Sequence, residues 1–476
     1  MIPSRLRLPA PLACFLLAVA ARALVASRVA LPGRDGATYL WMGEQVTSGN
    51  FAASFQTVFP PVYPWTIAAV LAVAPDLDVV VAGQAASGGL AALAVFPLFM
   101  LTQRLIHREA ATFTCLFYAL GTWFCRHPAD CMSEGPFYLW VACAALLLVR
   151  KAATWSTVTT GILIALAYGT RPEGAALAIV SVPWMWMQDR RHGLLLAAST
   201  LVASLAFPLG YMAFGPGFTV TPKAAFMWPH GAGGGNGGSD GIWFYLEHVL
   251  RLPGHAFEAL GYLATIFAVV GITRRRDRSL RSGESLLLLL FLLQVLVIPL
   301  ARSTIRFVSG YGMLMLVFAG AGFVRVRCWP RLSSRPAFAA RLLLAFAPDL
   351  VRLPQAQRED KQIERDLGEF LRARMQPSDI VVSAEHRASS SYDLPFSMCR
   401  VEFFVGMEPS PPRPLAIAEL RAMAQDPRCK FGLIAQEPAG FGQEDLVALG
   451  FEPMALPDDL AHRAAKRRIA AFERRR

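Results

Sequence analysis

Residues 194–214 read LLLAASTLVASLAFPLGYMAF and contain no charged side chain. A helix of this length can cross the hydrocarbon core of a bilayer, which needs about 20 predominantly apolar residues. The whole chain agrees with this stretch, because 54% of its residues are hydrophobic and only 17% are charged, against roughly 25% charged in an average soluble chain. We therefore predict an integral membrane protein, and the composition excludes a soluble globular domain.

Further apolar runs follow the same pattern, and charged residues cluster in the short segments between them. Several runs are shorter than a full span, but flanking Trp, Tyr, Gly or Ser residues extend them. The first run could be a cleaved signal peptide, and we favour a retained helix because the later loops need that starting orientation. The runs are Ala10–Val29, Val79–Leu101, Ala110–Phe124, Pro136–Val149, Val158–Tyr168, Ala175–Met187, Ala256–Ile272, Leu286–Leu300, Phe307–Val324 and a weak last one at Ala337–Phe346.

The positions of the basic residues predict the orientation of these runs. With the N-terminus inside and the runs alternating, most Arg and Lys residues between the runs fall in inner loops, as cytoplasmic loops require. The net charge of +12 is explained in this way, so it does not indicate nucleic-acid binding. We predict about 11 transmembrane helices and a tail on the extracytoplasmic side.

The chain divides into residues 1–353, the transmembrane domain, and residues 354–476, a soluble tail of ordinary composition. In the tail, 358–375 has the apolar stripe of an amphipathic helix, and 379–383, 431–435 and 451–454 read as strands. Their alternation with helical stretches predicts a small α/β domain. The fold class is therefore an all-α polytopic membrane bundle with a small C-terminal α/β soluble domain.

The cysteines and a Gly-rich stretch do not indicate a functional site. The eight cysteines include no C-x-x-C pair, which argues against a thiolate zinc site. Cys125 with Cys131 and Cys399 with Cys429 could form disulfides in an oxidising compartment, and we favour free thiols. The Gly-rich stretch 231–238 lacks the Gly-Lys-Ser/Thr of a phosphate loop, so a flexible linker or lid is the better interpretation.

Charged residues at the edge of a membrane are costly and are candidates for function. Each has an alternative role as a helix cap, a local ion pair or an interfacial anchor. On the predicted topology they share one membrane face, where carboxylates could accept a proton and arginines could bind phosphate oxygens in pairs. The candidates are Asp35, Asp130, Glu134, Arg171, Glu173, Arg302 and Arg306.

Five short motifs in the membrane part make the chain resemble the GT-C superfamily of polytopic glycosyltransferases. Within it, the protein O-mannosyltransferases and the lipid A aminoarabinose transferases are most similar. The motifs are Arg34-Asp35-Gly36-x-x-Tyr39, Pro60-Pro61-Val62-Tyr63-Pro64-Trp65, Ser133-Glu134-Gly135-Pro136-Phe137, Thr170-Arg171-Pro172-Glu173-Gly174 and Arg306-Phe307.

This resemblance implies that Asp35 is the catalytic base and that substrates are bound by Glu134, Arg171, Glu173, Arg306 and Tyr63. Two departures matter. Phe59 stands where some relatives place a lysine that meets the donor phosphate, so the phosphate would be bound elsewhere, by Arg171, Arg306 or Lys223. Gly36 replaces a second acidic residue of some relatives, so we expect no metal and no other cofactor.

We interpret the chain as an inverting glycosyltransferase of the inner or plasma membrane. It would move a hexosyl or pentosyl group from a polyprenyl-monophosphate donor to a hydroxyl of an extracytoplasmic glycan, lipid or protein. The alternative is a flippase or transporter for a lipid-linked sugar, although transporters place their sites near the midplane of the bilayer. A third alternative is a membrane receptor with an α/β sensor domain.

Overall fold

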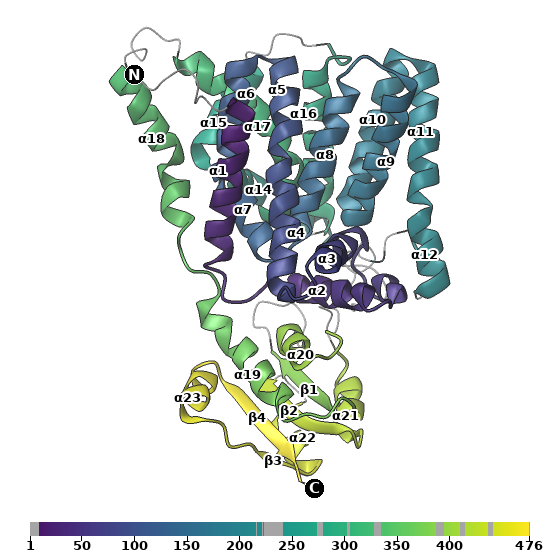
Figure 1. Cartoon of the computed structure of the whole chain (residues 1–476), viewed down its shortest axis with the longest axis vertical. Coiled ribbons are helices and arrows are strands. Elements are labelled where there is room, and N and C mark those ends of the chain that lie inside the picture. Colours follow the sequence, from purple (N-terminus) through teal and green to yellow (C-terminus); the bar gives the residue numbers. More distant parts are fainter. Residues whose placement is uncertain are drawn as a thin grey trace. The chain divides into compact units, whose positions relative to one another are not determined.

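Helices form nearly all of the described chain up to residue 352 (Figure 1). Helical backbone satisfies its own hydrogen bonds, which a segment in hydrocarbon must do. These helices are α1 (Ala10–Ala26), α2 (Arg34–Thr47), α3 (Val62–Val73), α4 (Val79–Leu93), α5 (Val95–Leu105), α6 (Arg108–Leu120), α7 (Thr122–Ala129), α8 (Glu134–Leu148), α9 (Thr154–Thr170), α10 (Ala175–Gln188), α11 (Arg190–Ser204), α12 (Ala206–Phe214), α14 (Gly241–Leu260), α15 (Tyr262–Thr273), α16 (Gly283–Ala301), α17 (Ile305–Arg327) and α18 (Arg335–Arg352), with 3₁₀ turns η2 (Phe51–Phe55) and η3 (Pro172–Gly174).

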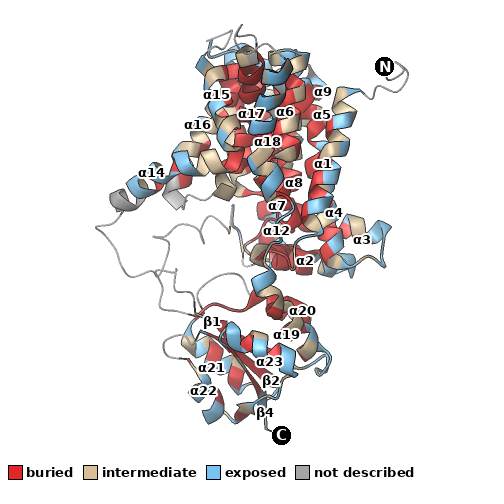
Figure 2. Ribbon diagram, turned by 90° about the vertical axis from the view of Figure 1, so that its left-hand side faces the viewer, coloured by how far each residue is buried: buried red, intermediate tan, exposed pale blue. Residues whose placement is uncertain are grey.

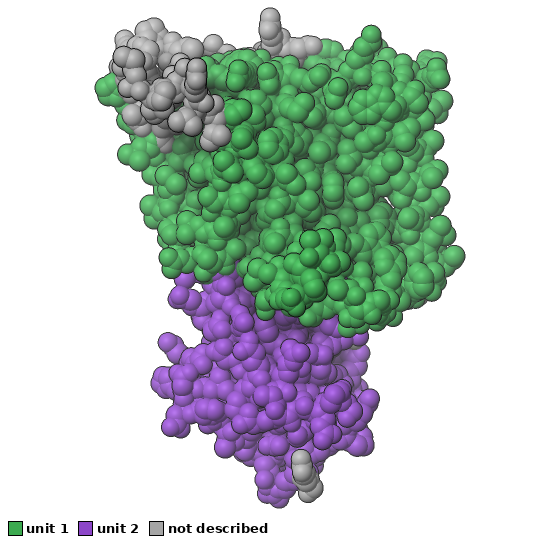
Figure 3. Space-filling model, in the orientation of Figure 1, with its two compact units in different colours: residues 1–28, 43–355 green, residues 29–42, 356–476 purple. Residues whose placement is uncertain are grey.

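The computed structural model describes residues 9–215, 217–220, 222, 241–273, 279–301, 305–327, 335–386, 395–409, 415–436 and 441–475. The chain forms two compact units, coloured separately in Figure 3. The first unit is Met1–Arg28 with Gly43–Gln355, and the second unit is Val29–Met42 with Ala356–Arg476. The segment that carries Asp35 therefore belongs to the same unit as the C-terminal residues.

Several segments are long and apolar enough to cross a membrane. Three are Val79–Leu105, Arg190–Phe214 and Ile305–Val326, and a fourth is the pair Tyr245–Leu260 and Tyr262–Thr273 if its two helices form one span. Shorter apolar helices such as α1, α8 and α16 accompany them. The prediction of a multi-pass helical protein is confirmed, and the number of 11 spans remains a prediction.

Two apolar runs that we predicted as single segments are each broken at a glycine. The run 110–124 divides into α6 and α7 at Gly121. The run 256–272 divides into α14 and α15 at Gly261, where the two helices bend by 105°. Gly261 has φ +88°, a left-handed conformation that glycine adopts without a steric penalty. The hydrophobicity of the sequence is uninterrupted at both glycines, so it predicted one continuous helix in each case. The helical backbone is interrupted at both positions.

The centre of the first unit is α17, which is buried along nearly its whole length (Figure 2). Small residues allow its neighbours to approach closely, as in other membrane bundles. A Cβ atom added to Gly322 would lie 1.9 Å from the carbonyl oxygen of Phe267 on α15, and one added to Gly320 would lie 2.3 Å from Oγ1 of Thr114 on α6. These contacts fix α6 and α15 against α17, whose first residues carry Arg306.

The second unit contains a four-stranded mixed sheet in the order β1-β2-β4-β3. Strand β1 (Ile380–Glu385) runs parallel to β2 (Cys429–Ala435), and β4 (Ile469–Arg474) runs antiparallel to both β2 and β3 (Phe451–Pro453). Alternate side chains point to opposite faces. One face packs on α19 (Gln362–Arg372), α20 (Cys399–Val405) and α23 (Asp458–Lys466), and the other on α21 (Ile417–Gln425) and α22 (Gln443–Ala448).

The predicted α/β tail is therefore present. The three expected strands correspond to β1, β2 and β3, and the amphipathic stretch contains α19. Strand β4 was not predicted, because its sequence IAAFER lies among terminal basic residues. The four cysteines considered for disulfides, Cys125, Cys131, Cys399 and Cys429, are free and buried.

Candidate functional site

A buried carboxylate begins helix α8. Glu134 is the first residue of that helix and its side chain is completely buried. The next residue must be glycine, because a Cβ atom on Gly135 would lie 2.0 Å from the carbonyl oxygen of Ser87 on α4. The Ser87 hydroxyl also donates to the carbonyl oxygen of Met132, at 2.6 Å. Close packing of α4 on this turn thus fixes the position of Glu134.

The second charged motif folds back on the end of α9. Arg171 ends α9 and Pro172 begins the η3 turn, where proline loses no hydrogen bond. A Cβ atom on Gly174 would lie 2.3 Å from the backbone nitrogen of Tyr168, so only glycine allows this turn. The turn directs the Arg171 guanidinium inward, where its side chain is only 4% exposed.

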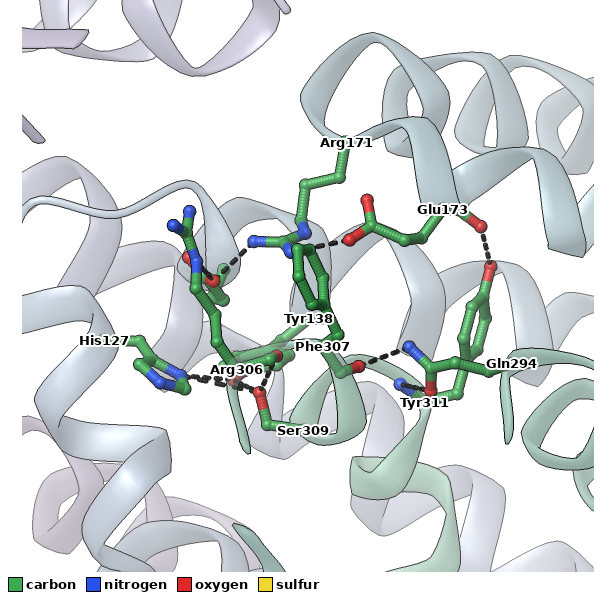
Figure 4. Close-up of polar contacts among 10 residues, drawn as sticks. His127, Tyr138, Arg171, Glu173, Gln294, Arg306, Phe307, Ser309 and Tyr311 are labelled. Atoms are coloured by element: carbon green, nitrogen blue, oxygen red, sulfur yellow. Dashed lines mark hydrogen bonds and ion pairs between the residues drawn. The ribbon is translucent and has the colours of Figure 1, made fainter. Parts of the chain in front are cut away.

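Arg171 and Arg306, which are labelled in Figure 4, both pair with the carboxylate of Glu134 although they lie far apart in the sequence. Both form ion pairs with Oε1 of Glu134, and Arg306 also donates a hydrogen bond to it through Nε. Arg171 has a second carboxylate partner in Glu173, at 2.7 Å. The structure thus brings together four of the predicted substrate-binding residues in one cluster, which we call the Glu134 cluster: Glu134, Arg171, Glu173 and Arg306.

Polar side chains from the apolar helices α16 and α17 support this cluster. The Tyr311 hydroxyl donates to the carbonyl oxygen of Glu173 at 2.9 Å, and the Gln294 amide donates to that of Phe307 at 2.5 Å. The Arg171 guanidinium also lies over the ring of Phe307, 5.6 Å from its centroid. These contacts hold the cluster in one arrangement.

A second set of hydrogen bonds fixes the start of α17. The Tyr138 hydroxyl donates to the Ser309 hydroxyl at 3.0 Å, and Ser309 donates to the carbonyl oxygen of Arg306 at 2.8 Å. His127 Nδ1 lies 3.4 Å from the Tyr138 hydroxyl (Figure 4). The backbone of Arg306 is therefore held independently of its guanidinium.

The Glu134 cluster has two positive and two negative side chains, so it is not simply a cationic phosphate site. Arg306 is 18% exposed and Glu173 is 21% exposed, whereas Glu134 is fully buried. The second carboxylate oxygen of Glu134 has no hydrogen-bond partner among the described residues. The geometry gives Glu134 the position of a counter-ion that orients both guanidinium groups, whereas the side chains of Arg306 and Glu173 reach the surface in part.

Asp35, the predicted base, lies in the first turn of α2 and is half-buried. Its neighbours in sequence are held within the second unit. Arg34 donates to Oε1 of Glu385 at 3.2 Å, and the Thr38 hydroxyl lies 3.5 Å from the sulfur of Cys399. Burial raises the pKa of Glu385, and the nearby Arg34 partly offsets this effect. C-terminal residues therefore fix the backbone that carries Asp35.

The remaining candidates have different surroundings. The Tyr63 hydroxyl donates to the carbonyl oxygen of Gly83 at 3.0 Å, which links α3 to α4. Phe59 is buried, and its carbonyl oxygen accepts a hydrogen bond from Tyr211 at 3.2 Å. Asp130 is also buried. Lys223, Arg302 and the Gly-rich stretch 231–238 lie outside the described residues.

Sequence reasoning missed several members of this site. Tyr138, Ser309 and Tyr311 are buried polar residues within helices that we treated as uniform apolar runs. Gln294 is another, in α16. A polar side chain inside an apolar run costs free energy unless it has a partner, and that signal could have identified them. Among the described residues, no group of three or more His, Cys, Asp or Glu side chains is arranged to hold a metal ion.

Comparison with solved structures shows that the chain has a known fold. The chain superposes on ArnT from Cupriavidus metallidurans bound to undecaprenyl phosphate with a TM-score of 0.65, covering 97% of both chains at 12% identity. It superposes on the oligosaccharyltransferase of Archaeoglobus fulgidus in complex with zinc and sulfate with a TM-score of 0.63, covering 93% of this chain and 70% of the other at 16% identity.

A further structure of the Archaeoglobus fulgidus oligosaccharyltransferase AglB, in complex with an inhibitory peptide and a dolichol-phosphate, gives a TM-score of 0.55 at 13% identity, over 89% of this chain and 69% of the other. No family model and no curated protein sequence matches the chain. The similarity is thus one of structure, and it shows that the chain has the GT-C fold of these transferases, as the motifs predicted.

Proposed function

We propose that this chain is a membrane glycosyltransferase of the GT-C type that uses a sugar on a polyprenyl monophosphate. The observation that carries the proposal is the agreement of fold over 97% of both chains with ArnT, whose structure holds undecaprenyl phosphate. The Glu134 cluster supports it, because a guanidinium group that is oriented by a buried carboxylate can bind phosphate oxygens in pairs.

In the proposed reaction, the carboxylate of Asp35 accepts the proton of the acceptor hydroxyl as its oxygen attacks the anomeric carbon. The bond between that carbon and the phosphate oxygen breaks, and polyprenyl phosphate leaves with the electron pair, so the configuration inverts. Arg306 stabilises the charge that grows on the phosphate. Glu134 and Arg171 position Arg306, Glu173 binds the sugar or the acceptor, and the buried Tyr63 supports the substrate site through its hydrogen bond from α3 to α4.

The finer features of the proposal follow from the sequence. The protein would have about 11 spans, with its C-terminal domain on the extracytoplasmic side of the inner or plasma membrane. The donor would carry a hexosyl or pentosyl group, and the acceptor would be the hydroxyl of a glycan, lipid or protein.

The direct experiment measures the release of polyprenyl phosphate from a sugar-charged polyprenyl phosphate by the purified full-length protein. Asp35→Asn keeps the size of the side chain and removes the base, so we expect the rate to fall by a factor of about 10² or more. Glu44→Gln is the matched control, because it removes an exposed carboxylate from the same helix. An Asp35→Asn protein that turns over at the wild-type rate would show that Asp35 is not the base.

A second variant tests the binding of the donor phosphate. Arg306→Lys keeps the positive charge and loses the paired contact, so we expect weaker donor binding, seen as a higher KM. Arg251→Lys is the control, because Arg251 is 58% exposed and, among the described residues, its ion-pair partner is the exposed Glu247 one helical turn away. An unchanged KM in Arg306→Lys would remove Arg306 from the donor site.

The alternative function is movement of a lipid-linked sugar across the bilayer. It predicts transfer of the intact lipid between leaflets of a vesicle without cleavage of the bond to the sugar. The location of the Glu134 cluster at the first residue of α8, at the end of a helix, favours the transferase, because transporters place their sites near the midplane of the bilayer.

A further inference from the structure

A basic cavity lies among α5, α8 and α9, in the first unit. Its volume is about 460 Å³, and its charged and aromatic lining is Arg104, Arg150, Lys151 and Trp155. Arg104 belongs to the last turn of α5, and the other three belong to the connection from α8 to α9 and to the first turn of α9. The volume lies in the range of small-molecule binding sites, which is about 300–1,000 Å³.

This cavity is separate from the Glu134 cluster. Glu134 begins α8 and Arg171 ends α9, whereas the cavity lies at the opposite end of each helix. Helix α8 has 15 residues, and at 1.5 Å per residue its ends are roughly 22 Å apart. The positive-inside rule places the connection from α8 to α9 at the cytoplasmic face, so the two sites face opposite leaflets.

The three cations of this cavity lack a carboxylate counter-ion within the part of the chain that the structure describes. Among the described residues, none of Arg104, Arg150 and Lys151 forms an ion pair with a carboxylate. Arg104 and Lys151 are exposed, and Arg150 is half-buried. Positive charges that converge on one cavity repel each other, so an anion that enters it is stabilised.

The aromatic residue indicates the source of that anion. Trp155 is 61% exposed, and the Arg150 guanidinium lies 5.9 Å from the centroid of its ring. Exposed tryptophan at the end of a membrane helix is typical of the interface, where the ring contacts lipid at the level of the head groups. Basic pockets between membrane helices on the cytoplasmic side bind anionic head groups.

We propose that this cavity binds the phosphate of an anionic phospholipid head group from the cytoplasmic leaflet. Arg150 and Lys151 contact the phosphate oxygens, Arg104 contributes charge from α5, and Trp155 packs against the glycerol region. A soluble phosphate compound offers the same charge but has no apolar part for Trp155 to contact. The bound lipid would join the ends of α5, α8 and α9, and the proposal does not depend on the transferase activity.

The test titrates the purified full-length protein in detergent with phosphatidylglycerol and counts the bound lipids by native mass spectrometry. We expect one phosphatidylglycerol to bind at least tenfold more tightly than phosphatidylcholine. Arg150→Gln with Lys151→Gln should weaken this binding roughly 30-fold, because each basic residue at an anionic surface contributes a factor of about five.

The matched control is Arg190→Gln with Arg191→Gln. It removes the same charge from exposed residues at the start of α11, which the positive-inside rule assigns to the same face, and neither residue lines the cavity. Retained binding in the control supports a defined site, whereas an equal loss in both double variants would show only general attraction and overturn the proposal. Displacement of the lipid by inorganic phosphate at comparable concentration would overturn the assignment to a lipid. All four substituted residues are exposed or half-buried, and thermal unfolding of each variant checks its folding.

Discussion

Glu134→Gln is the sharpest perturbation of the cluster that the structure offers. The wild-type carboxylate is fully buried and pairs with Arg171 and Arg306, which are 4% and 18% exposed. Removing one partner of a buried ion pair typically costs about 3–5 kcal/mol of stability. The glutamine oxygen still accepts one hydrogen bond, and Arg171 keeps Glu173 at 2.7 Å. We therefore expect the low end of that range, about 3 kcal/mol.

The assay is thermal unfolding of the purified protein, with Glu173→Gln as the matched control. The Glu173 side chain is 21% exposed, so its loss should cost about 1 kcal/mol or less. We expect Glu134→Gln to lower the Tm by roughly 5 °C or more, and the control to lower it far less.

A double-mutant cycle separates the ion pair from a general effect of the substitution. In Glu134→Gln with Arg306→Gln, the lone buried charge is gone, so the loss should be smaller than the sum of the two single losses by about 0.5–3 kcal/mol. Equal Tm values for Glu134→Gln and Glu173→Gln, together with strictly additive losses, would refute the assignment of Glu134 as the shared counter-ion.

Three further predictions concern other parts of the molecule. Burial raises the pKa of Glu385 and the nearby Arg34 partly offsets this effect, so Arg34→Gln should raise this pKa further. The stability deficit of the variant should therefore grow as pH rises through that pKa and shrink in acid to the part that comes from the contacts of Arg34 with the Ser397 carbonyl and the Phe396 ring; thermal unfolding at acid and neutral pH checks this, and a deficit independent of pH would contradict it. Gly135→Ala should destabilise the protein by at least 1–3 kcal/mol, since the added methyl group would overlap the backbone of α4, while Gly89→Ala should not, because a Cβ there meets nothing within 4 Å; thermal unfolding of both compares them. Val447 is 55% exposed, and a membrane-impermeant thiol reagent should label Val447→Cys in intact cells if the C-terminal domain is extracytoplasmic, whereas labelling only after permeabilisation would place it inside.

The fold class was predictable because membrane helices and amphipathic elements leave strong periodic signals. Long uncharged stretches such as 194–214 can be assigned as helices without tertiary information. A segment in hydrocarbon must satisfy its backbone hydrogen bonds internally, and a helix does so. Strands β1 and β2 were predictable from short β-branched and apolar runs. Strand β4 was not, because its pairing with β2 and β3 is a long-range contact that its own composition does not indicate.

The candidate site was predictable in part. The motifs around Glu134 and Arg171 contain glycines that the structure requires at close backbone approaches, so these motifs reflect packing as well as chemistry. Arg306 stood out as a charge at the start of an apolar run. Gln294 and Tyr311 could not be identified in this way, because the sequence does not reveal which group an isolated polar residue in an apolar helix will contact after the helices pack.

The sequence by itself determined that the chain lies in a membrane, that its C-terminal part has strands as well as helices, and which charged residues are costly enough at a membrane edge to need a role. These properties depend on hydrophobicity, charge and periodicity, which are local. Only the tertiary structure decided that Arg171 and Arg306 share one carboxylate, and that the segment carrying Asp35 packs with residues after Ala356. Such pairings depend on how helices distant in sequence approach one another, and that approach is set by the complementary shapes of whole helix faces rather than by any single stretch of residues.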